Sequence, residues 1–230
     1  MEAMRFRKND PKADCQGSLG WSYNDCWGET GWSIIDHYLR RKASYYSVRR
    51  ACAPVKVIVR APDGRLAVRV VNDTLKSYEA VVRYGWVRLD GTASEWQEKN
   101  ITIPGDSMIE VTNMPLPSKT ERDPRSWIYA ALLNGTGIPE DQATWLLAPH
   151  RELALAKPAI SSRINNGVLE VSSPVYCHGV HIEDGGHEVL ADNYFDLVPG
   201  IPRRIAITAP SSSGTYALSA ITPILESLKR

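Results

Sequence analysis

Four side chains near the N-terminus have types and spacing that suit carbohydrate binding: Trp21, Asn24, Asp25 and Trp27. Indole rings offer flat apolar faces and an N–H donor, while amide and carboxylate groups supply hydrogen bonds. A sugar ring has apolar faces and a rim of hydroxyl groups, so this combination predicts a sugar-binding site. The alternative is that the tryptophans fill a core or an interface, because aromatic side chains dominate both.

The residues around these side chains predict a strand, a loop and a helix. Gly17 to Tyr23 is short and lightly apolar and is followed by polar residues, which is typical of a strand that ends in a loop. Ser33 to Asp36 matches a capping box, so a helix is expected to begin there and to end before Pro54. In a βα barrel, ligand-binding residues lie at the C-terminal ends of strands and in the loops that follow, where these four side chains would lie.

The same loop does not predict independent catalysis. A retaining glycosidase needs two carboxyl groups about 5–5.5 Å apart on either side of the scissile bond. Asp25 and Glu29 are the only carboxylates in the loop, and one loop is poorly placed to flank a bond from both sides. Neither a Gly-rich phosphate loop nor a G-x-S-x-G serine elbow occurs in the sequence. We therefore assign no catalytic residue and expect no cofactor.

Composition limits the other function classes. The length of 230 residues is enough for two ordinary domains, and the 43% hydrophobic composition indicates a globular chain. The formal net charge is +1. A nearly neutral chain gives no field that would recruit nucleic acid or an anionic membrane, and no apolar run approaches the ~20 residues of a membrane span. The first eleven residues are charged and resemble no secretory signal. Four cysteines without CxxC spacing favour a reducing compartment, so a cytoplasmic location is preferred and export is left open.

Two further groups of residues suggest other functions. Cys177, His178, His181 and His187 are zinc-type ligands, but residues 177 and 181 of a strand face one side and residue 178 the other. We therefore favour a sheet surface with scattered histidines and predict no metal site.

A basic run between residues 40 and 50 is interleaved with tyrosines, as in some nucleic-acid-binding segments. The neutral net charge favours a solvated helix face instead. The basic residues are Arg40, Arg41, Lys42, Arg49 and Arg50.

After Pro54 the pattern changes to short alternating strands with frequent turns, which is typical of β-sandwiches. The turn at residues 62–64 predicts a hairpin, and Asn165-Asn166-Gly167 predicts another. His150 to Lys157 is a plausible joint between two sandwiches. The expected strands cover residues 55–59, 66–71, 78–89, 100–103, 107–112, 126–133, 144–148, 160–164, 168–171, 175–182, 194–197, 204–208 and 215–220.

These residues carry a family resemblance. GSLGWSYNDCW and the following GWSIIDHYLRRKASYYSVRRACAPV resemble the last barrel strand and helix of the β-mannosidase branch of glycoside hydrolase family 2. Trp21 matches the strand-end tryptophan that walls the terminal sugar subsite, while Ser22 and Tyr23 replace the usual Gln and Leu. Two later runs resemble the same family's interdomain join and terminal immunoglobulin-like domain. They are Trp145 to Leu153 and Asp192 to Gly200.

The resemblance implies a mainly β chain with a truncated (β/α)8 barrel in residues 1–53 and immunoglobulin-like sandwiches in residues 54–150 and 151–230. It implies that Trp21, Asn24, Asp25 and Trp27 bind a β-mannoside or related β-glycoside in the intact enzyme. Both catalytic glutamates would then lie before Met1, in a missing barrel portion that is the expected partner. A non-catalytic carbohydrate-binding or scaffolding module and a glucosaminidase or galactosidase relative remain alternatives.

Overall fold

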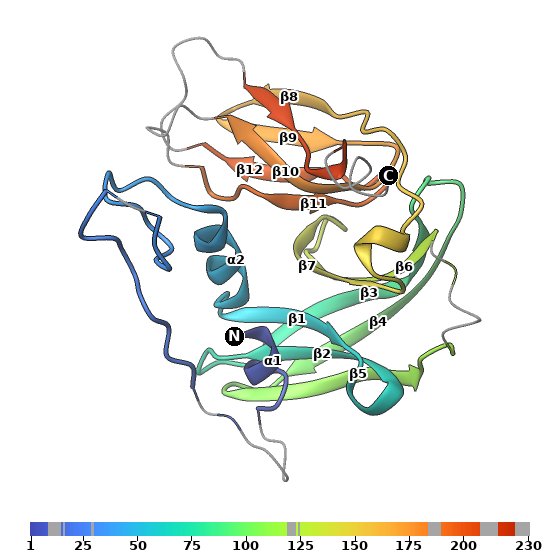
Figure 1. The fold of residues 1–230 in the computed structure, drawn as a ribbon. Helices are drawn as coiled ribbons and strands as arrows, with labels where there is room; N and C mark the ends of the chain where they lie inside the picture. The colour runs from blue at the N-terminus through green and yellow to red at the C-terminus, as the bar shows by residue number, and fades with distance from the viewer. Residues whose placement is uncertain are drawn as a thin grey trace. The chain divides into compact units, whose positions relative to one another are not determined.

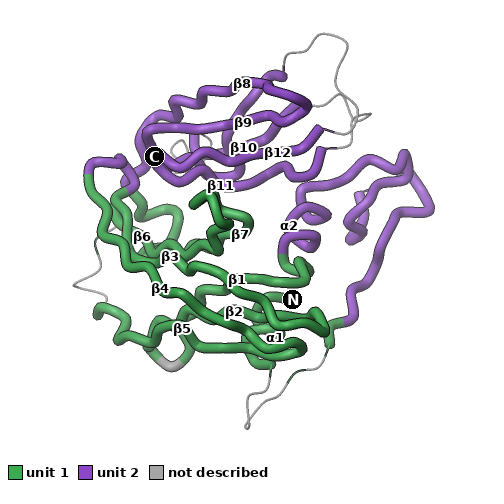
Figure 2. The backbone as a smooth tube through the Cα atoms, turned by 180° about the vertical axis from the view of Figure 1, so that it is seen from behind, with its two compact units in different colours: residues 1–18, 51–88, 93–153 green, residues 19–50, 89–92, 154–230 purple. Residues whose placement is uncertain are grey.

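The computed structural model describes residues 1–8, 15, 17–28, 30–118, 123, 125–183, 190–207 and 216–223 (Figure 1). The chain divides into two compact units, coloured separately in Figure 2. Unit 1 comprises Met1–Ser18, Ala51–Arg88 and Ala93–Leu153. Unit 2 comprises Leu19–Arg50, Leu89–Thr92 and Ala154–Arg230, so it combines the tryptophan-containing stretch with the C-terminal strands.

Unit 1 is a sandwich of two antiparallel sheets. One sheet has the order β1-β2-β5 and the other β4-β3-β6-β7. Inward-facing side chains of both sheets form one apolar core, including Val57, Val68, Val82 and Ile128. The strands are β1 (Val55–Arg60), β2 (Arg65–Asn72), β3 (Tyr78–Arg88), β4 (Ser94–Ile103), β5 (Ser107–Pro115), β6 (Ser126–Leu133) and β7 (Pro139–Leu146), with the short helix η1 (Pro62–Gly64) between β1 and β2.

The N-terminal helix α1 (Glu2–Arg5) and the turn after it pack on unit 1. Phe6 is buried against Ile58 and Val71, on the face of the β1-β2 sheet opposite to the main core. Lys8 pairs with both Asp73 and Asp106 at 2.7 Å. Burial opposes the charge of Lys8, but the hydrogen bonds to these carboxylates outweigh it and raise the pKa of Lys8. These contacts explain why so short a helix is ordered.

Unit 2 contains a second, smaller sandwich whose sheets have the orders β12-β9-β8 and β11-β10-β13. Its core includes Leu169, Val180, Phe195 and Ile205. Asn166 and Gly167 both have positive φ, 48° and 73°, which is the backbone of a two-residue type I′ hairpin turn. The strands are β8 (Ser161–Asn165), β9 (Val168–Ser172), β10 (Cys177–Glu183), β11 (Phe195–Leu197), β12 (Arg203–Ala206) and β13 (Ala217–Ser219); the joint carries η2 (His150–Glu152).

The mainly β prediction is confirmed, as are the two sandwiches and both hairpins. The largest boundary differences are at β4, which begins at Ser94 rather than near Asn100, and at β7, which covers Pro139–Leu146 rather than residues 144–148. No helix in the described residues has the length and apolar character needed to span a membrane.

The predicted strand at Gly17 to Tyr23 is wrong, because these residues form no strand. A strand needs a neighbour to satisfy its backbone groups, and none of the described strands pairs with this stretch. The predicted helix start at Ser33 is also wrong. Helix α2 (Ala43–Ala51) begins ten residues later, because the Ser33 hydroxyl donates to the Ile35 carbonyl at 2.7 Å instead of capping a helix. Asp36 accepts hydrogen bonds from the backbone and side chain of Arg40, which closes a turn.

Candidate functional site

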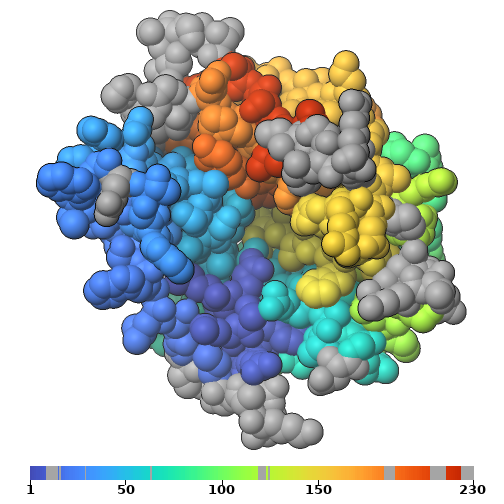
Figure 3. Space-filling view, in the orientation of Figure 1, coloured from blue at the N-terminus to red at the C-terminus, as the bar shows by residue number. Residues whose placement is uncertain are grey.

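The candidate site lies on residues 19–42, here called the tryptophan segment, which belongs to unit 2. Its large side chains Trp21, Trp27 and Trp32 are exposed, and the segment belongs to the blue surface in Figure 3. Trp21 is 91% exposed and Trp27 is 71% exposed, so neither ring fills a core. This exposure excludes the core-filling alternative raised by the sequence, and it leaves the two indoles as surface groups available to a ligand or to an interface with a partner.

The segment keeps its shape through backbone hydrogen bonds centred on Ile35. The amides of Ile34 and Ile35 donate to the Tyr23 carbonyl at 3.2 and 3.1 Å, and the Asp25 amide donates to the Ile35 carbonyl at 3.0 Å. The Lys42 amide in turn donates to the Ile34 carbonyl at 3.0 Å. These hydrogen bonds therefore join the residues before the exposed loop to the residues after it, just before the chain enters α2.

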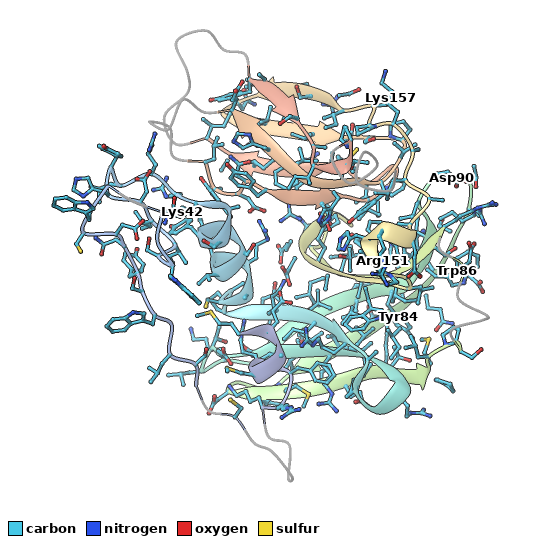
Figure 4. The ribbon with its side chains drawn as sticks, in the orientation of Figure 1. Lys42, Tyr84, Trp86, Asp90, Arg151 and Lys157 are labelled. Atoms are coloured by element: carbon cyan, nitrogen blue, oxygen red, sulfur yellow. The ribbon has the colours of Figure 1, made fainter. Side chains whose placement is uncertain are left out.

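A single ammonium group fixes the inside of the loop. Lys42, labelled in Figure 4 where the segment enters α2, places Nζ 2.6 Å from Oδ2 of Asp25. The same Nζ donates to Oγ of Ser33 at 2.9 Å and to the Gly31 carbonyl at 3.3 Å. The Asp25 side chain is only 9% exposed. A Cβ on Gly31 would lie 2.3 Å from Oδ1 of Asp25, so the carboxylate occupies space that only a glycine leaves open.

The ion pair determines the charge state of Asp25. The hydrogen bond from Lys42 is the largest cause that lowers the pKa of Asp25 below its ordinary value of 3.8. Asp25 is therefore a carboxylate at neutral pH and cannot serve as a proton donor there. In this structure Asp25 holds the loop through its ion pair with Lys42.

Acid is expected to loosen the tryptophan segment. A carboxylate with a lowered folded-state pKa contributes stability that is present above its unfolded pKa and is lost as pH falls through the folded value. The contribution of Asp25 should therefore be complete at neutral pH and disappear below pH 3.8. Tryptophan emission recorded from pH 7 to pH 2 should show a change in this acid range that the variant Asp25→Asn lacks. Identical pH profiles for the two proteins would contradict this assignment.

The structure places the four predicted residues in two groups. Trp21, Asn24 and Trp27 are exposed, whereas the Asp25 side chain is largely buried in its ion pair with Lys42. Of the two loop carboxylates, Asp25 is bound to Lys42 and Glu29 lies outside the described residues. The arrangement offers stacking surfaces and an amide, which suits binding of a sugar ring rather than its cleavage.

The histidines and Cys177 of unit 2 occupy separate environments. Cys177 is buried and its Sγ lies 3.3 Å from Oγ of Ser173, while His178 Nδ1 lies 2.9 Å from Oδ1 of Asp196. His181 stacks on Tyr194 with ring centroids 4.6 Å apart. The fourth residue of that prediction, His187, lies outside the described residues. Within the described part of the chain, no group of three or more His, Cys, Asp or Glu side chains could hold a metal ion.

The predicted solvated face of the basic run is wrong for its most important members. Lys42 is bound to Asp25 and Arg50 to Asp192, and both basic side chains are less than one-third exposed. Sequence reasoning missed these pairs because the partners are 17 and 142 residues apart, far beyond the i, i+4 spacing that a helix pattern reveals.

Comparison with known proteins agrees with both sandwiches. Residues 64–152 match the Mannosidase Ig/CBM-like domain, and residues 155–220 match the Ig-fold domain of the Ig_mannosidase model. Beta-mannosidase B of Thermothelomyces thermophilus is 54% identical over 213 residues, covering 81% of this chain and 25% of that protein. Beta-mannosidase B of Aspergillus fumigatus is 46% identical over 216 residues, covering 84% and 25%. This chain thus spans about a quarter of the length of these relatives.

Solved structures give the same result. The β-D-mannosidase of Dictyoglomus thermophilum has a TM-score of 0.80 and 28% identity, covering 91% of this chain and 26% of that one. The exo-chitosanase CsxA of Amycolatopsis orientalis has a TM-score of 0.73 at 14% identity, covering 95% and 31%, which supports the fold alone. The chain therefore carries, in residues 64–152 and 155–220, the C-terminal immunoglobulin-like domains of a β-mannosidase B-like protein of glycoside hydrolase family 2.

Proposed function

We propose that this chain is the accessory C-terminal part of an exo-acting β-mannosidase, which hydrolyses terminal β-mannosidic bonds. The observation that carries the proposal is the tryptophan segment: exposed indoles on a loop held by Lys42 and Asp25, in a chain whose relatives are β-mannosidases. In the intact enzyme Trp21, Asn24, Asp25 and Trp27 contribute to the terminal sugar pocket. Asp25 does so by shaping the loop, since its carboxylate is already bound.

In this proposal the chain supports the barrel and the rest of the enzyme carries out catalysis. In the intact enzyme, residues 1–53 pack as the last part of a (β/α)8 barrel whose other strands this chain does not contain. The sandwiches of residues 54–150 and 151–230 support the barrel. Catalysis by two carboxyl groups on opposite sides of the bond is assigned to the rest of the enzyme, so the isolated chain is expected to be inactive.

A non-catalytic carbohydrate-binding or scaffolding module is the second candidate. The Ig/CBM-like domain match and the exposed indoles favour it, because both are compatible with sugar binding without turnover. The two proposals differ in what the chain does when the rest of an enzyme is supplied. Only the first predicts that hydrolysis is restored.

A chimera tests the first proposal. The matching quarter of T. thermophilus Beta-mannosidase B is replaced by this chain, and hydrolysis of p-nitrophenyl β-mannoside is measured for the chimera and for the chain alone. We expect the chimera to retain kcat/KM within about tenfold of its parent, a loss of at most about 1.4 kcal/mol in transition-state stabilisation. We expect no turnover by the chain alone.

Two outcomes would count against this assignment. A chimera that folds, as judged by circular dichroism and light scattering, but lacks activity would oppose the accessory role. Hydrolysis by the isolated chain would show that its own carboxylates suffice. Saturable binding of mannose by the chain, combined with an inactive folded chimera, would favour the binding module.

A further inference from the structure

We infer that Arg50 is a positioning residue, through which the C-terminal sandwich sets the position of the tryptophan segment. This inference rests on the proposed function, since it concerns the same sugar-binding loop. It goes beyond that function by giving the C-terminal sandwich a specific task and by naming the side chain that performs it. All residues involved belong to unit 2.

Arg50 joins the end of α2 to the run between β10 and β11. Its Nη1 donates to Oδ1 of Asp192 and, at 2.9 Å, to the Asn193 carbonyl, while Nη2 donates to the Tyr194 carbonyl at 3.0 Å. The Asp192 side chain is 14% exposed and also accepts from Nε of Arg203 at 3.1 Å. A planar guanidinium with several fixed donors can make this set of contacts, whereas a lysine ammonium cannot reproduce its geometry.

The run that Arg50 binds is itself fixed to the sandwich. Asn193 is almost fully buried, and its side chain accepts from the Ile182 amide at 2.8 Å and donates to the Ile182 carbonyl at 2.9 Å. Tyr194 has a φ of 52°, in the left-handed region that non-glycine residues rarely adopt. Such a conformation persists only where its surroundings hold it. Arg50 therefore binds a defined turn that is connected to β10.

An aromatic contact supports the same attachment. Tyr46, one helical turn before Arg50, is only 2% exposed, and its ring centroid lies 6.0 Å from that of Tyr194. Tyr194 stacks on His181 on β10 at 4.6 Å. The polar contacts of Arg50 are thus accompanied by a buried aromatic one from the same helix face.

Helix α2 carries this attachment to the tryptophan segment. Lys42, immediately before its first residue, binds Asp25, and Arg50 lies at its other end. Eight residue steps at 1.5 Å separate them by about 12 Å. A nine-residue helix is unstable alone in water, so its order depends on packing. Removing the contacts of Arg50 should therefore loosen α2, and with it the Lys42–Asp25 pair that shapes the loop.

Amide hydrogen exchange on the full chain tests this inference. The reporters are the amides of Asp25, Ile35 and Lys42, which donate to backbone carbonyls within the segment. In Arg50→Gln we expect their exchange to accelerate about tenfold or more, equal to about 1.4 kcal/mol. Amides of β8 and β9 should keep their wild-type rates. Arg204→Gln is the matched control, because Arg204 also pairs with a carboxylate of unit 2, Glu170, and should leave the reporters unchanged.

Arg50→Lys provides a second variant in case Arg50→Gln fails to fold. Lysine keeps the charge opposite Asp192 but loses contacts to the two carbonyls, so the reporters should exchange faster than in the wild type while the sandwich stays protected. Unchanged reporter exchange in a folded Arg50→Gln or Arg50→Lys protein would overturn the inference. So would an equal acceleration across β8, β9 and the segment, which would indicate a general stabilising role.

The chimera separates failure of this inference from failure of the proposed function. With Arg50→Lys in an active chimera, KM for p-nitrophenyl β-mannoside should rise about three- to tenfold with kcat nearly unchanged, because ground-state and transition-state binding weaken together. An inactive unsubstituted chimera opposes the proposed function and leaves the exchange result to decide the role of Arg50. An active chimera whose KM does not respond to Arg50→Lys opposes the positioning role alone.

Discussion

Replacing Lys56 with alanine should lower the free energy of unfolding of unit 1 by about 3–5 kcal/mol, the usual effect of breaking a buried ion pair from one side. Lys56 is 2% exposed, and its Nζ lies 3.0 Å from Oδ1 of Asp141. Oδ2 of the same carboxylate accepts from the Val57 amide at 2.9 Å, so Asp141 links β1 to β7. Without the ammonium, a carboxylate that is only 15% exposed loses its cation.

Urea denaturation measures the change in the free energy of unfolding. Hydrogen-exchange protection of the β6 amides provides a signal that is specific to unit 1. Lys56→Met keeps most of the buried alkyl chain but removes the ammonium with its charge and hydrogen bonds, so it separates packing from polar interactions. Lys99→Ala is the surface control, because Lys99 is exposed and its Nζ donates to the Val111 carbonyl at 3.3 Å; the substitution should change stability by less than about 0.5 kcal/mol. A loss below about 1 kcal/mol in Lys56→Ala would show that the pair is not important for stability.

The sandwich strands could be predicted from local sequence because their pattern is local. β1 and β2 are runs of β-branched residues on either side of the Pro62–Gly64 turn, and the structure pairs Val59 with Val68 across that hairpin. Asn166-Gly167 likewise predicts its own turn, since two consecutive positive φ values favour these residue types. In each case the residues that determine the element are neighbours along the chain.

The tryptophan segment differs because distant residues decide its structure. Ser33 to Asp36 fits a capping box, but the Lys42 ammonium binds the Ser33 hydroxyl and the Asp25 carboxylate, and the helix begins only after Lys42. Capping rules consider residues three apart, so they do not include the Lys42 ammonium, which is nine residues from Ser33. The sugar-binding role of Trp21, Asn24, Asp25 and Trp27 stays a prediction, and the roles of Lys42 and Gly31 could be found only from the structure.

Arg50 shows the same limit over a longer range. Its partners at residues 192–194 are supplied by the other end of unit 2, and nothing near Arg50 in the sequence distinguishes it from the solvent-facing Arg49. The run Asp192 to Gly200 could be related to a terminal immunoglobulin-like domain, but its contacts with α2 could not be derived from either stretch alone.

The second large effect is expected at Trp21 within an active chimera. An exposed indole that stacks on the terminal sugar contributes apolar contact that alanine cannot provide. Trp21→Ala should therefore raise KM for p-nitrophenyl β-mannoside by about tenfold or more, equal to about 1.4 kcal/mol of lost binding. Trp32→Ala is the matched control, because Trp32 belongs to the same segment and is 93% exposed but is not among the predicted sugar-binding residues.

This comparison of KM values tests most directly whether the tryptophan segment binds the sugar substrate of a β-mannosidase. The predicted result is a large increase for Trp21→Ala, an increase of less than about twofold for Trp32→Ala, and wild-type circular dichroism for both. Equal KM values for Trp21→Ala and the unsubstituted chimera, in a folded and active protein, would contradict the sugar-binding role of this segment.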